Sequence, residues 1–159
     1  MDNQEDNALA RTLFPPGSLT FILSIICSII ALVMALGLAT VVFGQLVGGD
    51  SLPKLVVFMF VAGVFLIVHP NFRLTRGAKW PVTYMLVLLV SCLLLTVSTL
   101  AWASIQGPRN VFAGGCVAVV AAVLALLGYR SQALERFRAH FDERWSEHYR
   151  RREAIAAKK

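Results

Sequence analysis

The sequence predicts an all-α membrane protein, in which four transmembrane helices form an antiparallel bundle followed by a C-terminal cytoplasmic amphipathic helix. Apolar residues make up 57% of the 159-residue chain and charged residues 15%, which is more apolar side chain than a soluble domain of this size can bury. The charged residues between Ser18 and Tyr129 all lie in short breaks between long apolar runs: Asp50, Lys54, Arg73, Arg76, Lys79 and Arg109. Membrane spans separated by short loops have this distribution.

Residues 1–17 are expected to form a short acidic segment on the cytoplasmic side. A cleaved secretory leader would begin with basic residues and carry an apolar core of roughly 7–15 residues. Residues 1–17 instead contain three acidic residues, Asp2, Glu5 and Asp6, and one basic residue, Arg11. The first apolar run is 24 residues long. We therefore expect the first run to be retained as a membrane helix, with Ser18 as its N-cap.

The membrane domain is expected to cover residues 18–130, with spans at about 20–43, 52–69, 80–104 and 111–129. The first run would form a helix about 36 Å long, so it must tilt in a hydrocarbon core of roughly 30 Å. The second apolar run is shorter, and we expect flanking residues to extend it as far as His69, just before Pro70. Backbone groups in lipid must be satisfied within the segment, which makes all four spans helices.

The distribution of positive charge predicts that both termini are cytoplasmic. One side of the bundle would carry Arg11, the three basic residues of the 69–79 loop and nine in the tail. The other side would carry only Lys54 and Arg109. Cytoplasmic loops hold the excess of Lys and Arg, so the first side faces the cytoplasm, as expected for a bacterial inner-membrane protein. The net charge of +6 then reflects topology rather than nucleic-acid binding.

The spans contain few groups that could carry chemistry. No Asp, Glu, Lys or Arg lies inside them, whereas ion-coupled transporters and proton pumps need ionisable groups at membrane depth. His69 has no second histidine in another span with which to bind haem. Cys27, Cys92 and Cys116 each occur alone, without a CxxC pair. We therefore expect no catalytic residues, no cofactor, no metal site and no enzymatic activity.

Small residues recur at every fourth position in two of the spans. In a helix this spacing places them on one narrow face, where two backbones can approach closely. Such faces serve either packing within the bundle or association with another subunit, and the sequence leaves both open. The predicted packing residues are Cys27, Ala31, Ala35 and Ala39 in the first span and Gly114, Ala118 and Ala122 in the fourth.

Two basic clusters are expected to contact anionic lipid headgroups on the cytoplasmic side. The first lies in the loop that precedes Trp80, where a specific phosphate or headgroup site is the alternative to diffuse contact. The second lies near the end of the tail. Their members are Arg73, Arg76, Lys79, Arg150, Arg151 and Arg152.

Residues 131–159 predict a basic amphipathic helix that continues from the fourth span, with Gly128 as a bend. When the residues are placed at 100° intervals around the helix axis, the large apolar side chains fall within an arc of roughly 120° and form one face. We interpret this face as a contact surface for a partner or for the membrane surface. It consists of Leu134, Phe137, Phe141, Trp145 and Tyr149.

Two other readings of this tail are disfavoured. Acidic residues interrupt the basic ones, and no second helix completes a DNA-binding helix-turn-helix, so we expect no nucleic-acid partner. His140, Glu143 and His148 are irregularly spaced on one helix, without another ligand-rich segment to complete a metal site. A membrane-surface helix and a helix docked in a groove of another protein, or of a second copy, remain.

The expected function is that of a non-enzymatic accessory or assembly subunit of a membrane complex. Its expected partners are membrane lipids and another membrane or cytosolic protein, or a second copy of the chain. The alternative is a component of a small transporter or pore, formed when four-span bundles assemble around a path lined by hydroxyl groups. That path would use Ser24, Ser28, Thr96 and Thr99.

Overall fold

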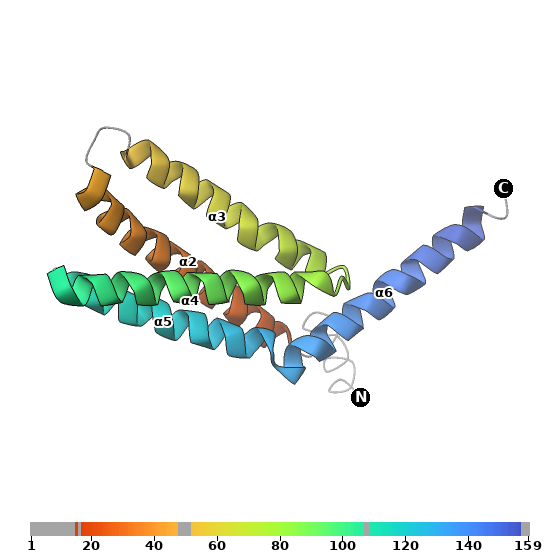
Figure 1. The fold of residues 1–159 in the computed structure, drawn as a ribbon. Coiled ribbons are helices and arrows are strands. Elements are labelled where there is room, and N and C mark those ends of the chain that lie inside the picture. The colour runs from red at the N-terminus through yellow and green to blue at the C-terminus, as the bar shows by residue number, and fades with distance from the viewer. Residues whose placement is uncertain (1–14, 16, 48–51, 107–108, 157–159) are drawn as a thin grey trace, which may run out of the picture.

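The computed structural model describes residues 15, 17–47, 52–106 and 109–156. The described residues form five helices, joined by short connections, and no strand (Figure 1). The helices are α2 (Ser18–Val47), α3 (Leu52–Leu74), α4 (Trp80–Gln106), α5 (Arg109–Tyr129) and α6 (Gln132–Ala156). Each of the first four contains a segment long and apolar enough to cross a membrane: Ser18–Val42, Val57–Leu74, Trp80–Ile105 and Phe112–Tyr129. The prediction of four such helices is confirmed.

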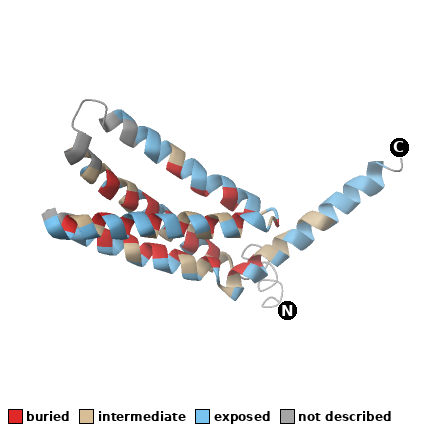
Figure 2. Ribbon diagram, in the orientation of Figure 1, coloured by how far each residue is buried: buried red, intermediate tan, exposed pale blue. Residues whose placement is uncertain are grey.

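The four apolar helices lie alongside one another, and α6 extends away from one end of the group (Figure 1). α2 contacts each of the other helices, most extensively α5. Buried residues line the facing sides of the helices, whereas their outer sides expose large apolar side chains (Figure 2). Phe58 is 69% exposed and Leu94 is 64% exposed. Such wide apolar surfaces are suited to contact with lipid.

The closest packing is between α2 and α5, through small side chains. Ala35 and Ala118 are each 1% exposed, and so are Ala31 and Ala122 one turn away. A Cβ atom added to Gly128 would overlap Ser24 Oγ, so the two backbones approach closely near the end of α5. Of the seven predicted packing residues, five are buried (Ala31, Ala35, Ala39, Ala118 and Ala122) and two are half-buried (Cys27 and Gly114).

α3 extends further than the sequence suggested. We expected the second span to end at His69, but the helix passes through Pro70 and ends at Leu74. Proline lacks an N–H and usually breaks a helix interior. Here the buried face continues past it, since Ile67, Asn71 and Leu74 lie on one side of the helix and all point into the core. Tertiary packing therefore outweighs the local preference of proline.

A buried polar contact joins α3 to α5 at this end of the molecule. The Tyr129 hydroxyl donates a 2.7 Å hydrogen bond to Asn71 Oδ1. Asn71 Nδ2 in turn donates a 2.8 Å bond to the carbonyl of Ile67, one turn earlier in its own helix. Buried hydroxyl and amide groups need such partners, because leaving one unpaired costs the full desolvation of that group. This hydrogen bond links α3 to α5 within the buried part of the molecule.

We expect Asn71→Leu to lower the free energy of unfolding by about 1–3 kcal/mol, because it leaves the Tyr129 hydroxyl buried without its acceptor. Adding Tyr129→Phe to the same chain should recover part of this loss, since both polar partners are then gone. Reversible unfolding in mixed detergent micelles measures both effects. If the losses of unfolding free energy caused by the two substitutions were strictly additive, the coupling between Asn71 and Tyr129 would be contradicted.

Candidate functional site

α6 begins after a break in the chain rather than as a continuation of α5. α5 ends at Tyr129 and α6 starts at Gln132, whereas Gly128, the expected bend, lies inside α5. Ser131 occupies the break and caps the new helix, because its Oγ accepts a 3.3 Å hydrogen bond from the Leu134 N–H. The same Oγ donates a 2.7 Å bond to the Gly128 carbonyl. Ser131 therefore sets the direction in which α6 leaves.

The first half of α6 packs against the start of α2. The Phe137 ring stacks on the Phe21 ring, with centroids 4.6 Å apart, and Phe141 lies 4.8 Å from Phe137. Leu134 is 2% exposed and Phe137 is 4% exposed. Two of the five side chains predicted to contact a partner are thus buried in contacts within this chain, and Phe141 is half-buried.

The middle of α6 contacts the connection between α3 and α4. Trp145 Nε1 donates a 3.1 Å hydrogen bond to the Thr75 carbonyl. The Arg76 guanidinium lies 5.5 Å from the Trp145 ring centroid and 4.5 Å from that of Phe72, within the range of cation–π attraction. Trp145 is half-buried, whereas Tyr149, one turn further, is 57% exposed. The predicted aromatic face therefore becomes accessible only at its distal end.

Two glycines allow the backbone to approach α6. Within the described residues, Gly17 (φ 91°) and Gly77 (φ 81°) are the only positions with positive φ. A Cβ atom on Gly17 would overlap the Ala133 carbonyl oxygen, and one on Gly77 would lie 2.9 Å from the Asp142 Cα. Both glycines thus combine a conformation that other residues rarely adopt with a contact too close for a side chain. We name the contacts of α6 with Gly17, Phe21 and the Thr75–Gly77 turn the α6 junction.

An open groove of about 310 Å³ lies beside the α6 junction, and it is lined by Phe141, Arg144, Trp145 and His148. The predicted headgroup contacts surround this region without forming one cluster. Arg73 lies in the last turn of α3, Arg76 and Lys79 lie in the connection to α4, and all three are exposed. Arg150, Arg151 and Arg152 are exposed on distal α6.

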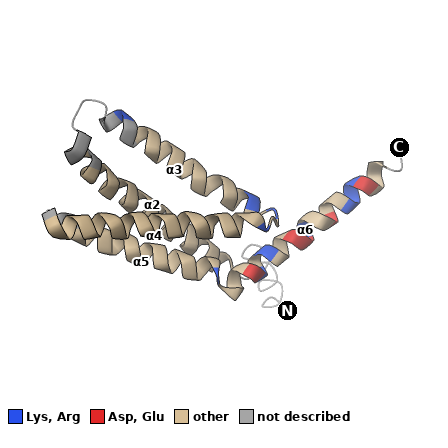
Figure 3. Ribbon diagram, viewed as in Figure 1, with Lys and Arg blue, Asp and Glu red and all other residues tan. Residues whose placement is uncertain are grey.

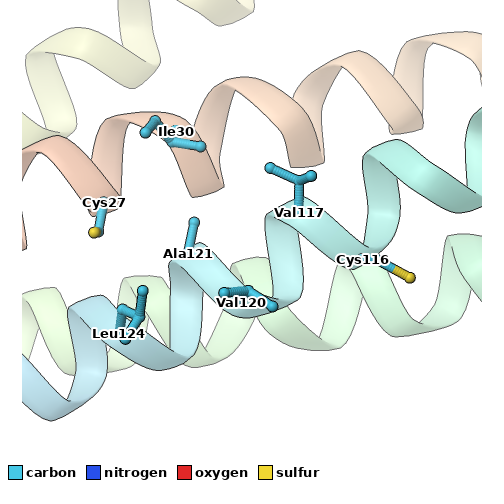
Figure 4. A pocket seen from close by; sticks show the side chains of 7 residues that line it. All are labelled: Cys27, Ile30, Cys116, Val117, Val120, Ala121 and Leu124. Carbon is cyan, nitrogen blue, oxygen red and sulfur yellow. The ribbon is translucent and has the colours of Figure 1, made fainter.

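A second groove, of about 350 Å³, lies between α2 and α5 (Figure 4). Its walls are apolar apart from the thiols of Cys27 and Cys116, which point in different directions. In the part of the chain that the structure describes, no group of three or more His, Cys, Asp or Glu residues is placed to hold a metal ion. Neither groove brings together a nucleophile and a base.

Sequence reasoning missed the residues that receive α6. Phe21 looks like any other apolar residue of the first span, and Gly17 like part of a helix start. The acceptor at position 75 is a backbone carbonyl, which no side-chain pattern reveals. Only Ser131 had a usable signal, because a serine followed by helix-forming residues is a typical N-cap.

In comparisons with protein-family models, with curated proteins and with solved structures, no match to this chain was found.

Proposed function

We propose that this protein is a non-enzymatic accessory or assembly subunit of a complex in a bacterial inner membrane. Its four apolar helices would cross the membrane as an antiparallel bundle, and distal α6 would present a docking surface to a partner protein. The observation that carries the proposal is the division of α6 into two parts. Its first half is held at the α6 junction, while every described residue after Ser146 is exposed (Figure 2).

The proposed orientation places both termini in the cytoplasm. The basic end of α3 and the start of α6 lie at the same end of the molecule (Figure 3). Lys54 lies in the first turn of α3, and α3 begins at the opposite end (Figure 1). An excess of Lys and Arg at one end is typical of the cytoplasmic side.

The geometry favours a protein partner over the membrane surface as the target of distal α6. The largest apolar side chains of the predicted face, including Phe137 and Trp145, are engaged by the chain itself. Beyond them only Tyr149 and Ile155 expose large apolar groups, among charges of both signs. An interfacial helix needs a continuous apolar face to bury in lipid. An aromatic anchor surrounded by mixed charge is instead typical of protein interfaces.

The proposal is tested by placing a photo-cross-linking residue at position 149 in the full-length protein in cells. We expect it to join one defined polypeptide, or a second copy, and to react from the cytoplasmic side in inverted vesicles. Removing residues 147–159 should abolish the complex on native gels while leaving the α6 junction folded. A cross-linker at the outward-facing Val120 is the matched control.

Several outcomes would contradict this proposal. The complex could survive the truncation, or position 149 could react only with lipid. Turnover or solute flux by the purified protein alone would also count against a non-enzymatic subunit.

The alternative, a transporter or pore component, is weakened by the positions of its four hydroxyl groups. Ser24, Ser28, Thr96 and Thr99 are all buried inside the group of helices. Each hydroxyl donates to a carbonyl of its own helix, at 2.7–2.8 Å. A path between associated copies would need these groups on the outer surface. Solute flux in liposomes distinguishes the two functions.

A further inference from the structure

Basic side chains from two separate elements lie around Trp145. Arg144 and His148 line the groove beside it, on the same face of α6. Arg76 approaches from the connection between α3 and α4, with its guanidinium 5.5 Å from the indole. Among the described residues that line the groove, none is acidic. The groove therefore has the charge and the N–H donors to bind a phosphate group.

The acidic residues of α6 near Trp145 are not among the residues that line the groove. Asp142 lies against the backbone of Gly77 rather than in the groove wall. Glu143 and Glu147 are exposed, and helical spacing places them on a different side of α6 from Trp145.

The groove lies at the end of a candidate membrane span. The Thr75 carbonyl, which accepts the hydrogen bond from Trp145, directly follows the segment Val57–Leu74. If that segment crosses the membrane, the indole and the three basic side chains lie at the level of the lipid headgroups. Tryptophan and basic residues are enriched at this level.

An exposed track of rings leads along α3 to the groove. Phe65, His69 and Phe72 are spaced so that they share one face of α3, and Arg76 follows in the turn after the helix; all four are exposed. The Phe65 and His69 rings are stacked with centroids 5.7 Å apart. Arg76 lies over the Phe72 ring at 4.5 Å. An apolar surface within the span is thus continuous with a basic groove at its end.

We propose that the corner between α3 and α6 binds an anionic phospholipid. Arg76, Arg144 and His148 hold its phosphate beside Trp145, and its acyl chains lie along Phe65 and Phe72. A free phosphate would use only the basic groove, whereas a phospholipid uses both the groove and the apolar track. This site rests on the proposed membrane placement of α3, and His148 is its one residue on distal α6.

The experiment uses the full chain with Trp80→Phe and Trp102→Phe, which leaves Trp145 as the only tryptophan. In nanodiscs, brominated phosphatidylglycerol should quench its fluorescence at about tenfold lower mole fraction than brominated phosphatidylcholine. Arg144→Ala should remove this preference. Arg136→Ala is the matched control, because it loses the same charge from an exposed position on the opposite face of α6 and should keep the preference.

Native mass spectrometry of the unaltered chain provides a second measurement that does not depend on the tryptophan substitutions. It should retain one anionic phospholipid through detergent exchange, and Arg144→Ala should lose it. Equal quenching by the two lipids, or equal effects of Arg136→Ala and Arg144→Ala, would show diffuse charge attraction and overturn the site. Suppression of quenching by inorganic phosphate, at concentrations that match the lipid, would overturn its assignment to a phospholipid.

Discussion

Phe137→Ala is expected to release α6 from the other helices and to lower the free energy of unfolding by about 3–5 kcal/mol. The Phe137 ring is 4% exposed, stacks on Phe21 and contacts Phe141, so its removal leaves a cavity at the centre of the α6 junction. The first turn of α2 cannot move into this cavity unless the rest of α2 moves with it.

Limited trypsin digestion in detergent measures the release of α6. Cleavage after Arg136 and Arg138 should be slow in the unaltered chain, because docking holds the backbone in a helix, and fast in the variant. Tyr149→Ala removes an aromatic ring from the same face, but this residue is 57% exposed. It should change the unfolding free energy by no more than about 0.5 kcal/mol and leave cleavage unchanged. Equal effects of the two substitutions would show that α6 is not docked.

Gly17→Ala is expected to have the second-largest effect, lowering the free energy of unfolding by about 2–5 kcal/mol. The backbone at Gly17 has a φ of 91°, which costs a residue with a side chain about 1–3 kcal/mol. The new methyl group would also overlap the Ala133 carbonyl oxygen, and a backbone atom cannot rotate away. The substitution thus acts on α6 although no residue of that helix is changed.

Gly37→Ala is the matched control, since nothing lies within 4 Å of a Cβ atom at this exposed helical position. It should be neutral, or stabilising by about 0.5–1 kcal/mol through the higher helix propensity of alanine. Both variants are compared by unfolding in micelles and by trypsin cleavage after Arg136. A Gly17→Ala protein that unfolds and is cleaved like Gly37→Ala would refute the close contact with Ala133.

The apolar helices could be predicted almost completely, because the requirement for a long uncharged run is local. The first span, expected at about 20–43, corresponds to the segment Ser18–Val42. The helix ends were less predictable. Pro70 suggested a stop before α3 had ended, because the face formed by Ile67, Asn71 and Leu74 is stabilised by neighbours from other parts of the chain. Gly128 suggested a bend, but its missing side chain serves the close approach of Ser24.

The candidate site was predictable only as a pattern. Helical periodicity groups the aromatic residues of α6 on one face, since angular spacing follows from sequence alone. What that face contacts depends on residues remote in the chain. Phe21 lies 116 positions before Phe137, and the Thr75 carbonyl lies 70 positions before Trp145.

The sequence by itself determined the class of this protein: four helices long and apolar enough to span a membrane, with basic residues concentrated in particular connections and in the tail. These features follow from composition and local periodicity, which need no knowledge of distant contacts. The tertiary structure decided how α6 is used. It buries Leu134 and Phe137, joins Trp145 to the α3–α4 connection by a hydrogen bond and leaves Tyr149 exposed. The physical reason is that burial depends on which surfaces meet in space.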